Sequence, residues 1–292
     1  MADTLHPDHL GIDIGGTNIR VARVNGAGEI LDRRAAASPR DAEAVTLLCI
    51  DLVKAMRGPA TASVGIGVPG QVDFAAQRVL SGGYVDLSSL PFAERISKAT
   101  GLPVTIDNDA TMALLAEAAL GAARGLANVV LLTIGTGIGG AILDRGTVLR
   151  GNRSAGQLGH LTVVPNGRPC VCGRIGCVET ESSGTAFATH LAEAGLPPGT
   201  TAQALVARAG DPLADQVITR WATPLRAAID TLIATLAPDA VVIGGGAGPA
   251  AIAALARFPA RASWFAAPVL TATLGDDAGV IGAALASRSP GR

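Results

Sequence analysis

A histidine and three cysteines in the middle of the chain have the types and the spacing of zinc ligands. Cys170 follows His160 after ten residues, and Cys172 and Cys177 come soon after it. Imidazole and thiolate are the usual donors to zinc, and a closed set of four is typical of a structural site. A disulfide is less favoured, because disulfide scaffolds are small and rich in cysteine. Three buried free thiols are disfavoured too, because the glycines between them make a poor core strand. We therefore predict a structural zinc ion.

Glycine-rich turns that follow apolar stretches could bind phosphate. Two of them read Gly15-Gly16-Thr17 and Gly135-Thr136-Gly137, and a third reads Gly244-Gly245-Gly246. Backbone N–H groups without side chains in the way can hold phosphate oxygens, and a threonine hydroxyl can add a bond. The alternative is a tight hairpin turn that needs positive φ. The recurrence of the turn in one chain favours the phosphates of a nucleotide.

Aspartates at the ends of two predicted strands could act on a metal ion or on a proton. Asp13 lies just before the first glycine turn, where a carboxylate could be an outer ligand of Mg²⁺. Asp107 and Asp109 flank Asn108 between a short strand and a helix, where a carboxylate could take a proton from an attacking hydroxyl. The alternative is that one of these residues only caps the helix. The spacing alone leaves both interpretations open.

The elements that must position these residues follow from the apolar pattern. Alternation predicts strands, the first two joined by a glycine turn, over residues 10–24, 29–33, 62–66, 103–106, 128–134, 141–149, 240–243 and 269–274. Helical spacing and end signals predict helices over 38–57, 91–101, 110–120, 185–194, 201–209, 213–236 and 279–287. The strand, glycine turn and strand of residues 10–24 recur at 128–149, which suggests two related α/β halves.

Composition narrows the class of protein. The chain has 292 residues, which favours about two domains, and 49% of them are apolar, enough for a sizeable core. Lysine and arginine number 23 against 24 acidic residues, without the basic patch that nucleic acid or an anionic membrane would require. We find no signal peptide and no apolar run long enough to span a bilayer. We expect a soluble cytoplasmic protein.

Six motifs, in this order and spacing, resemble those of the ROK family: GIDIGGT (11–17), GVPG (67–70), DNDA (107–110), IGTGIGG (134–140), GQLGH (156–160) and CVCGRIGCVE (170–179). The family contains bacterial sugar kinases and sugar-responsive repressors. The resemblance implies an α/β protein of the actin/hexokinase type, a ribonuclease H-like ATPase fold, with two domains around an active-site cleft. We expect the domains at 1–118 and 119–292, with the last helix packing back on the first domain.

The resemblance implies a role for each residue that matches a family motif. Asp109 resembles the general base that deprotonates the primary hydroxyl, at C6, of a hexose for attack on ATP. The residues that resemble sugar ligands are Gly67, Asn108, Asp109, Gln157, His160 and Glu179. Those that resemble ligands of ATP and Mg²⁺ are Asp13, Gly15, Gly16, Thr17, Thr136, Gly137, Gly245 and Gly246. The zinc ligands are expected to be His160, Cys170, Cys172 and Cys177, and zinc would order the sugar loop.

Three departures from the family pattern lie on the expected sugar side. Gln157 stands where the kinases often have glutamate, Thr111 replaces a common asparagine, and Val85 lies where a tryptophan is frequent. Glutamine keeps one acceptor but adds an NH₂ donor and loses the charge. The substrate is therefore expected to be glucose-like or an amino or N-acyl hexose.

The family offers alternatives to a kinase. One is a sugar-binding sensor without catalysis, and another is a transcriptional regulator that lacks its DNA-binding domain. Against the regulator, the first glycine turn begins only fifteen residues from Met1, which leaves no room for a helix-turn-helix, and no basic recognition helix is visible. Relatives are commonly dimers, so we expect a homodimer or higher homo-oligomer.

Overall fold

The computed structural model describes residues 7–153, 155–260 and 266–288, and the chain forms two compact units. The first unit takes its residues from three stretches, Met1–Arg124, Val148–Ala155 and Asp276–Arg292. The second unit consists of Gly125–Thr147 and Gly156–Gly275. The expected domain ranges, 1–118 and 119–292, stay a prediction. None of the described helices combines the length and the apolar character needed to cross a membrane.

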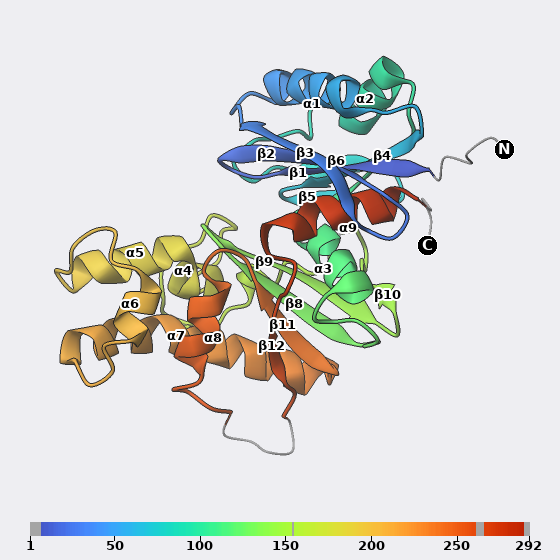
Figure 1. Cartoon of the computed structure of the whole chain (residues 1–292). Helices are drawn as coiled ribbons and strands as arrows, with labels where there is room; N and C mark the ends of the chain where they lie inside the picture. Colours follow the sequence, from blue (N-terminus) through green and yellow to red (C-terminus); the bar gives the residue numbers. More distant parts are fainter. Residues whose placement is uncertain (1–6, 154, 261–265, 289–292) are drawn as a thin grey trace. The chain divides into compact units, whose positions relative to one another are not determined.

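The first unit is a five-stranded sheet with helices on both faces (Figure 1). Its strands lie in the order β3 (Ile30–Ala37), β2 (Asn18–Val24), β1 (Asp8–Ile14), β4 (Thr61–Val68) and β7 (Val104–Asn108). The hairpin of β1 and β2 is antiparallel, whereas β1, β4 and β7 are parallel. One face is covered by α1 (Ala42–Met56) and α2 (Phe92–Thr100), and the other by α3 (Asp109–Leu120) and α9 (Ala278–Ser287).

Helix α9 lies directly on the backbone of β1 and β4 because glycines remove the side chains between them. A Cβ on Gly11 would lie 1.8 Å from the carbonyl oxygen of Val280, and one on Gly65 would lie 1.7 Å from that of Ala283. On its other side, a Cβ on Gly282 of α9 would lie 1.7 Å from the carbonyl oxygen of Met112 in α3. The last helix of the chain thus completes the first unit.

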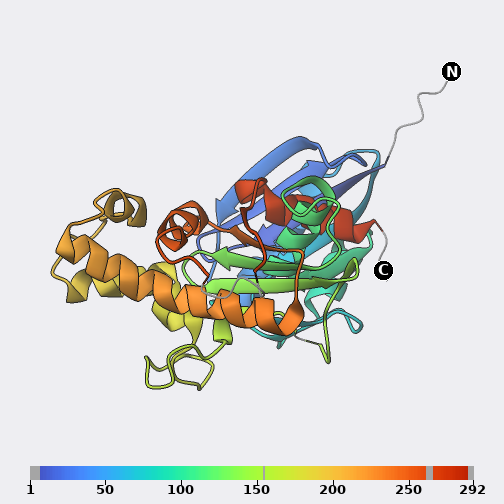
Figure 2. The ribbon, with the colours of Figure 1, turned by 90° about the horizontal axis from the view of Figure 1, so that it is seen from below.

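The second unit has a sheet of the same form. Its order is β10 (Thr147–Val148), β9 (Ile138–Asp144), β8 (Val129–Ile134), β11 (Ala240–Gly244) and β12 (Val269–Thr271). The long helix α7 (Pro212–Leu236) runs along one face of this sheet (Figure 2). The other α-helices in the described part of the unit are α4 (Val178–Ser182), α5 (Gly184–Glu193), α6 (Ala202–Val206) and α8 (Gly248–Leu255).

The register shows that the two sheets repeat one pattern. In the first unit Asp13 of β1 pairs with Gly67 of β4, and in the second Thr133 of β8 pairs with Gly244 of β11. In each case the first strand turns back through a glycine hairpin, while its other neighbour is a parallel strand. The recurring pattern in the sequence is therefore present in the topology.

Most predicted elements are present, and the differences have local causes. Helix α1 begins at Ala42, not at residue 38, because Asp41 is its N-cap and its Oδ1 accepts a bond from the backbone N–H of Ala44 at 2.8 Å. The strand predicted over 141–149 begins at Ile138 and ends at a turn in which Arg145 has a φ of 48°. The sequence analysis missed α8, α4 and a small hairpin of β5 (Gln71–Asp73) and β6 (Arg78–Ser81).

Candidate functional site

In the first unit, three predicted site residues lie in one row. Since β1, β4 and β7 are parallel, their carboxyl ends meet at the same edge of the sheet. The register pairs Gly67 with Asp13 on one side and with Asp107 on the other. Asp109 begins α3 immediately beyond, and a Cβ on Gly67 would lie 3.4 Å from its Cα. The strand ends thus bring Asp13, Gly67 and the start of α3 together.

Asp109 is a half-buried carboxyl group at the start of a helix. Its Oδ1 accepts a hydrogen bond from the backbone N–H of Ala110 at 2.8 Å. Burial raises the pKa of Asp109 to about 7, and the negative charge of Asp13 raises it too. Proton transfer is most efficient when the pKa of the catalytic group lies near the working pH. The environment thus suits Asp109 to act as a general base.

Asn108 is the N-cap of α3. Its Oδ1 accepts from the backbone N–H groups of Ala110 and Thr111 at 3.0 and 3.3 Å, and its Nδ2 donates to the carbonyl of Gly70 at 2.9 Å. Capping, the alternative raised for this stretch, therefore falls mainly to the asparagine. Thr111, one of the departures from the family pattern, is buried in the first turn.

Asp107 has a different task from Asp109. Its Oδ2 accepts from Nε and Nη2 of Arg150 at 3.0 and 2.8 Å, and the guanidinium of Arg150 lies 3.8 Å above the ring of Phe74. Burial raises the pKa of Asp107, while the charge of Arg150 lowers it. This carboxylate is occupied by a structural ion pair, so Asp109 is the better candidate for a base.

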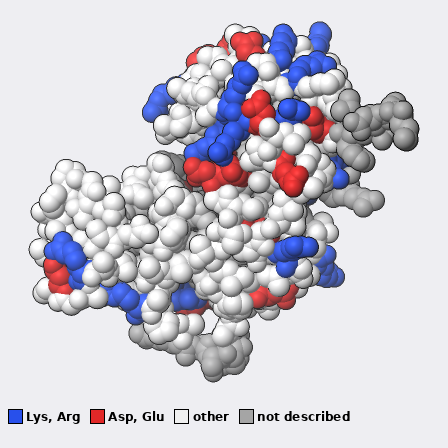
Figure 3. Space-filling model, in the orientation of Figure 1, with Lys and Arg blue, Asp and Glu red and all other residues white. Residues whose placement is uncertain are grey.

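Asp13 faces an arginine that the sequence analysis missed. Arg20 lies opposite Asp13 across the β1–β2 hairpin, and its Nη1 is 3.6 Å from Oδ2 of Asp13. Burial raises the pKa of Asp13, and Arg20 lowers it. Arg20 also contacts Asp276 at 3.1 Å, and Arg33 contacts Asp277 at 3.5 Å. On the face of the first unit drawn in Figure 3, basic and acidic side chains are accordingly mixed.

The first glycine turn is supported by the single tyrosine of the chain. Tyr84 donates a hydrogen bond from its hydroxyl to the carbonyl of Gly15, and its ring would lie 3.4 Å from a Cβ on Gly16. The backbone N–H of Ser38 donates to the carbonyl of Thr17 at 2.9 Å. Val85, the departure noted above, is buried in the core beside Tyr84. The sequence offered no signal for Tyr84 except its rarity.

In the second unit, the other two glycine turns lie against each other. The backbone N–H of Gly135 donates to the carbonyl of Gly137 at 2.9 Å, which closes the β8–β9 turn. Gly245 has a φ of +81°, and a Cβ there would lie 2.5 Å from the carbonyl oxygen of Ile134. The same carbonyl accepts from the backbone N–H of Ala247 at 2.9 Å. The predicted nucleotide residues Thr136, Gly137, Gly245 and Gly246 thus belong to one edge of the second sheet.

Glu179 lies on α4 and supports the second turn. Its Oε2 accepts from the backbone N–H of Ile138 at 2.8 Å, and a Cβ on Gly137 would lie 2.4 Å from the same oxygen. Gly137 must therefore be a glycine for Glu179 to approach. This contact between a predicted sugar residue and a predicted phosphate loop was not visible in the sequence.

The predicted zinc ligands come together in the second unit. One ligand atom from each of His160, Cys170, Cys172 and Cys177 lies within 4.8 Å of all the others. Nδ1 of His160 is 3.5 Å from Sγ of Cys170, and Sγ of Cys172 is 3.6 Å from Sγ of Cys177. A tetrahedral ion with Zn–S bonds of about 2.3 Å and Zn–N bonds of about 2.0 Å would separate its donors by about 3.5–3.8 Å. The donor set therefore fits zinc.

The 3₁₀ turn Leu158–His160 carries the remaining predicted sugar residues. Gln157 is half-buried and immediately precedes this turn, and its carbonyl accepts from the backbone N–H of His160 at 3.1 Å. His160 thus offers Nδ1 to the zinc set from the last position of this turn.

Comparisons with known proteins agree with these features. A model of the ROK family matches residues 9–289. Glucokinase of Halalkalibacterium halodurans is 34% identical over 307 residues, covering 94% of this chain and 93% of the relative. N-acetylmannosamine kinase of Escherichia fergusonii is 35% identical, covering 94% and 97%. The crystal structure of a ROK family glucokinase from Streptomyces griseus in complex with glucose and AMPPNP has a TM-score of 0.83 at 31% identity, covering 96% of this chain and 99% of that one. The two α/β units have the actin/hexokinase-type fold, and the chain belongs to the ROK family.

Proposed function

We propose that this chain is an ATP-dependent sugar kinase that phosphorylates the primary hydroxyl, at C6, of a glucose-like, amino or N-acyl hexose. The observation that carries the proposal is Asp109, a carboxyl with a pKa raised to about 7 at the strand edge that also holds Asp13. Relatives named glucokinase and N-acetylmannosamine kinase support the reaction class. That the protein is a cytoplasmic homo-oligomer stays a prediction.

The proposed mechanism needs little covalent chemistry from the protein. Asp109 accepts the proton of the sugar hydroxyl as its oxygen attacks the γ-phosphorus, and ADP leaves. Backbone N–H groups of the glycine turns hold the phosphate oxygens, in the first unit through Gly15, Gly16 and Thr17. Asp13 is the residue that would hold Mg²⁺, which neutralises phosphate charge when bound. Positioning and electrostatic stabilisation supply most of the catalysis in such transfers.

We assign the sugar ligands and the nucleotide ligands by unit. In the first unit the sugar would be bound by Gly67, Asn108 and Asp109. In the second unit the proposed sugar ligands are Gln157, His160 and Glu179, and the proposed nucleotide ligands are Thr136, Gly137, Gly245 and Gly246. Zinc would hold the loop that contains two of these sugar ligands.

The test is a coupled assay of ADP release with Mg-ATP across a panel of hexoses and amino sugars. We expect turnover on at least one sugar, and a loss of 10²-fold or more in Asp109→Asn, in line with about 10²–10⁴ for a general base. The wild-type kcat/KM should fall as the pH drops below about 7, because Asp109 then becomes protonated. Asp51→Asn, at an exposed position of α1, is the matched control. Equal activity of Asp109→Asn and wild type would contradict the proposed base.

A sugar-binding sensor without catalysis is the second candidate, and Gln157 is the observation that favours it. Loss of a carboxylate from the expected sugar side changes the hydrogen-bonding pattern offered to the substrate. Sugar binding by calorimetry without ADP release from folded, zinc-loaded protein would establish the sensor and exclude the kinase.

Zinc removal tests the proposed cofactor. Chelation should increase hydrogen exchange across residues 156–179 and abolish sugar binding, because the four donors fix the loop that precedes α4. Measured exchange in β1 and β4, in the first unit, serves as the internal control. Full sugar binding by protein verified to be metal-free would contradict a structural role for zinc.

A further inference from the structure

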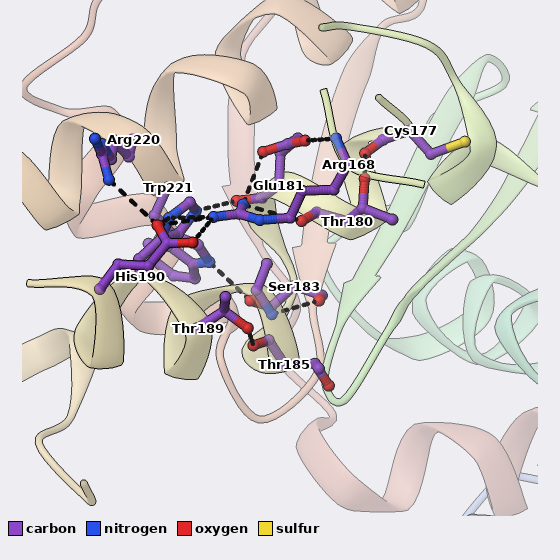
Figure 4. Close-up of polar contacts among 12 residues, drawn as sticks. Arg168, Cys177, Thr180, Glu181, Ser183, Thr185, Thr189, His190, Arg220 and Trp221 are labelled. Atoms are coloured by element: carbon purple, nitrogen blue, oxygen red, sulfur yellow. Dashed lines mark hydrogen bonds and ion pairs between the residues drawn. The ribbon is translucent and has the colours of Figure 1, made fainter. Parts of the chain in front are cut away.

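A polar cluster of the second unit joins the cysteine loop to three helices. The loop, here residues 164–177, contains Arg168, whose side chain points toward Glu181 and His190 (Figure 4). It also contacts Glu193 of α5. The proposed mechanism gives no task to these residues, although two of them, Glu181 and His190, are buried.

Glu181 of α4 binds both the backbone and the side chain of Arg168. Oε1 accepts from the backbone N–H of Arg168 at 2.9 Å, and Oε2 accepts from Nη1 at 3.0 Å. A Cβ on the preceding Gly167 would lie 2.6 Å from Oε1 of Glu181, so the glycine makes room for the carboxylate. One bond thus holds the loop backbone at Arg168, and the other holds its guanidinium.

The guanidinium of Arg168 also contacts two residues of α5, His190 and Glu193. Nε2 of His190 donates to the carbonyl of Glu181 at 2.9 Å, because a carbonyl can only accept. In the neutral ring Nδ1 is then an acceptor, and Nη2 of Arg168 lies 3.3 Å from it. Burial lowers the pKa of His190, which favours this neutral form. The same Nη2 lies 2.9 and 3.0 Å from the carboxylate oxygens of Glu193.

Helix α7 supports the cluster through Trp221 and Arg220. Nε1 of the fully buried Trp221 donates to the carbonyl of Ser183, between α4 and α5, at 3.0 Å. Arg220 contacts Glu193 at 3.2 Å and is half-exposed. The partners of Arg168 therefore sit on elements held in the core, whereas Arg220 touches only the outer end of the cluster.

The backbone carbonyl of Arg168 stabilises the fold of the cysteine loop. Its carbonyl accepts from the backbone N–H of Gly176 at 2.8 Å, which brings the two ends of the cysteine stretch together. Cys170 lies two residues beyond Arg168, and Cys177 is the N-cap of α4. The same short helix carries Glu179 and Glu181. A shift of α4 relative to the loop would therefore move both the predicted zinc ligand Cys177 and Glu179.

We propose that Arg168 is a positioning residue that ties the cysteine loop to α4 through Glu181, and thereby holds the zinc ligands and Glu179 in place. The statement about Glu179 rests on the proposed function, because only there does Glu179 bind sugar. The statement about zinc does not depend on catalysis. Residues that orient metal ligands typically contribute 10–100-fold to metal affinity.

The experiment compares zinc release and kinetics in purified full-length variants. Zinc transfer to a chromogenic chelator should be 10-fold or more faster in Arg168→Ala and Glu181→Gln than in wild type. Arg168→Lys keeps the charge but cannot reach several acceptors at once. Its rate of zinc release should therefore lie between those of wild type and Arg168→Ala. Arg220→Ala is the matched control and should release zinc within twofold of wild type. The KM for the sugar should rise at least 10-fold in Arg168→Ala, and the KM for ATP should rise less, because Glu179 binds the sugar but only supports the second glycine turn.

The possible results separate the role of Arg168 from the proposed kinase function. If zinc leaves Arg168→Ala and Glu181→Gln at the wild-type rate, the inference is overturned. It is also overturned if Arg220→Ala releases zinc as fast as Arg168→Ala, since the effect would then be general loosening. If wild type shows no turnover on any sugar while the difference in zinc release persists, the proposed kinase function fails and the role of Arg168 stands.

Discussion

At the scale of single residues, Asp107 at the end of β7 and Asp109 at the start of α3 differ because of what surrounds them. Asp107 is paired with Arg150, 43 residues away in the sequence. Among the described residues, Asp109 has no such partner charge and has a raised pKa, and its neighbour Asn108 caps the helix in its place. The sequence could place both candidates at the start of a helix. It could not choose between them, because the ion pair depends on a contact that only the folded chain makes.

The raised pKa of Asp109 predicts a pH-dependent cost to stability. The group is protonated below its usual pKa of 3.8 in both states, and in the folded state it ionises only near 7. Its stabilising contribution is therefore complete at low pH and is lost as the pH rises toward 7. The difference between 3.8 and about 7 corresponds to about 4 kcal/mol at most. In thermal melts, Asp109→Asn should gain in Tm relative to wild type from pH 4 to pH 7 and then level off.

Asp107→Asn is the control for that prediction. It weakens the charge pair with Arg150, so we expect it to lower stability near neutral pH by about 2–3 kcal/mol, somewhat below the cost of breaking a fully buried pair. If Asp109→Asn behaves in the same way, the two carboxyl groups have the same task and the distinction made here is wrong.

Gln157 predicts the choice of sugar. Its NH₂ group can pair with an acceptor on the substrate that a glutamate would repel. Gln157→Glu should shift kcat/KM toward glucose and away from N-acyl hexoses by 10-fold or more, measured with both sugars under the same conditions. An unchanged preference would show that the residue does not select the substrate.

At the scale of elements, the patterns located most strands and helices but not their contacts. Apolar alternation and glycine turns predicted the hairpins of β1–β2 and β8–β9. Helix α8 was missed because it is short and rich in alanine, and because no side chain caps its start after the glycine turn. The last helix was expected on the first domain, but its direct approach to the backbone of Gly11 and Gly65 was not predictable, since a glycine in a strand more often indicates a bulge.

The packing of α9 can be tested by Gly65→Ala. The added methyl group would lie 1.7 Å from the carbonyl oxygen of Ala283, so the helix must move away from the sheet. We expect a loss of about 1–3 kcal/mol or more in urea unfolding. Gly26→Ala is the control, because only the flexible end of Arg288, 4.0 Å away, lies near a Cβ there. Equal stability of the two variants would contradict the packing described.

At the scale of the whole chain, each unit has a core of its own. The core cluster around Trp221 draws all its members from the second unit. The first unit, in contrast, depends on the last stretch of the sequence for α9, which packs against β1, β2, β4 and α3. The motifs predicted the family and the fold, and the family resemblance implied that the last helix packs on the first domain. The assignment of Val148–Ala155 to the first unit had no signal in the sequence, because it rests on tertiary contacts between distant segments.

Shortening the chain tests that dependence. A chain ending at Gly275 lacks α9, so the apolar cluster of Ala22, Val24, Val280 and Ala284 loses half its members. We expect β1 and β4 to lose protection from hydrogen exchange while β8 and β11, in the second unit, keep theirs. A chain ending at Arg288 should behave as wild type. Retained protection of β1 in the shorter chain would contradict the role of α9.

The matched registers of the two sheets also bear on which side chains can change. Asp13 in the first sheet and Thr133 in the second occupy corresponding positions, each opposite a glycine on the parallel neighbour. The two sheets therefore share their strands and turns, whereas the proposed chemistry depends on a few side chains at the strand ends. Side chains at the strand ends of one sheet can therefore change without disturbing the strands and turns of either sheet. A scaffold that occurs twice thus allows two different binding surfaces within one architecture.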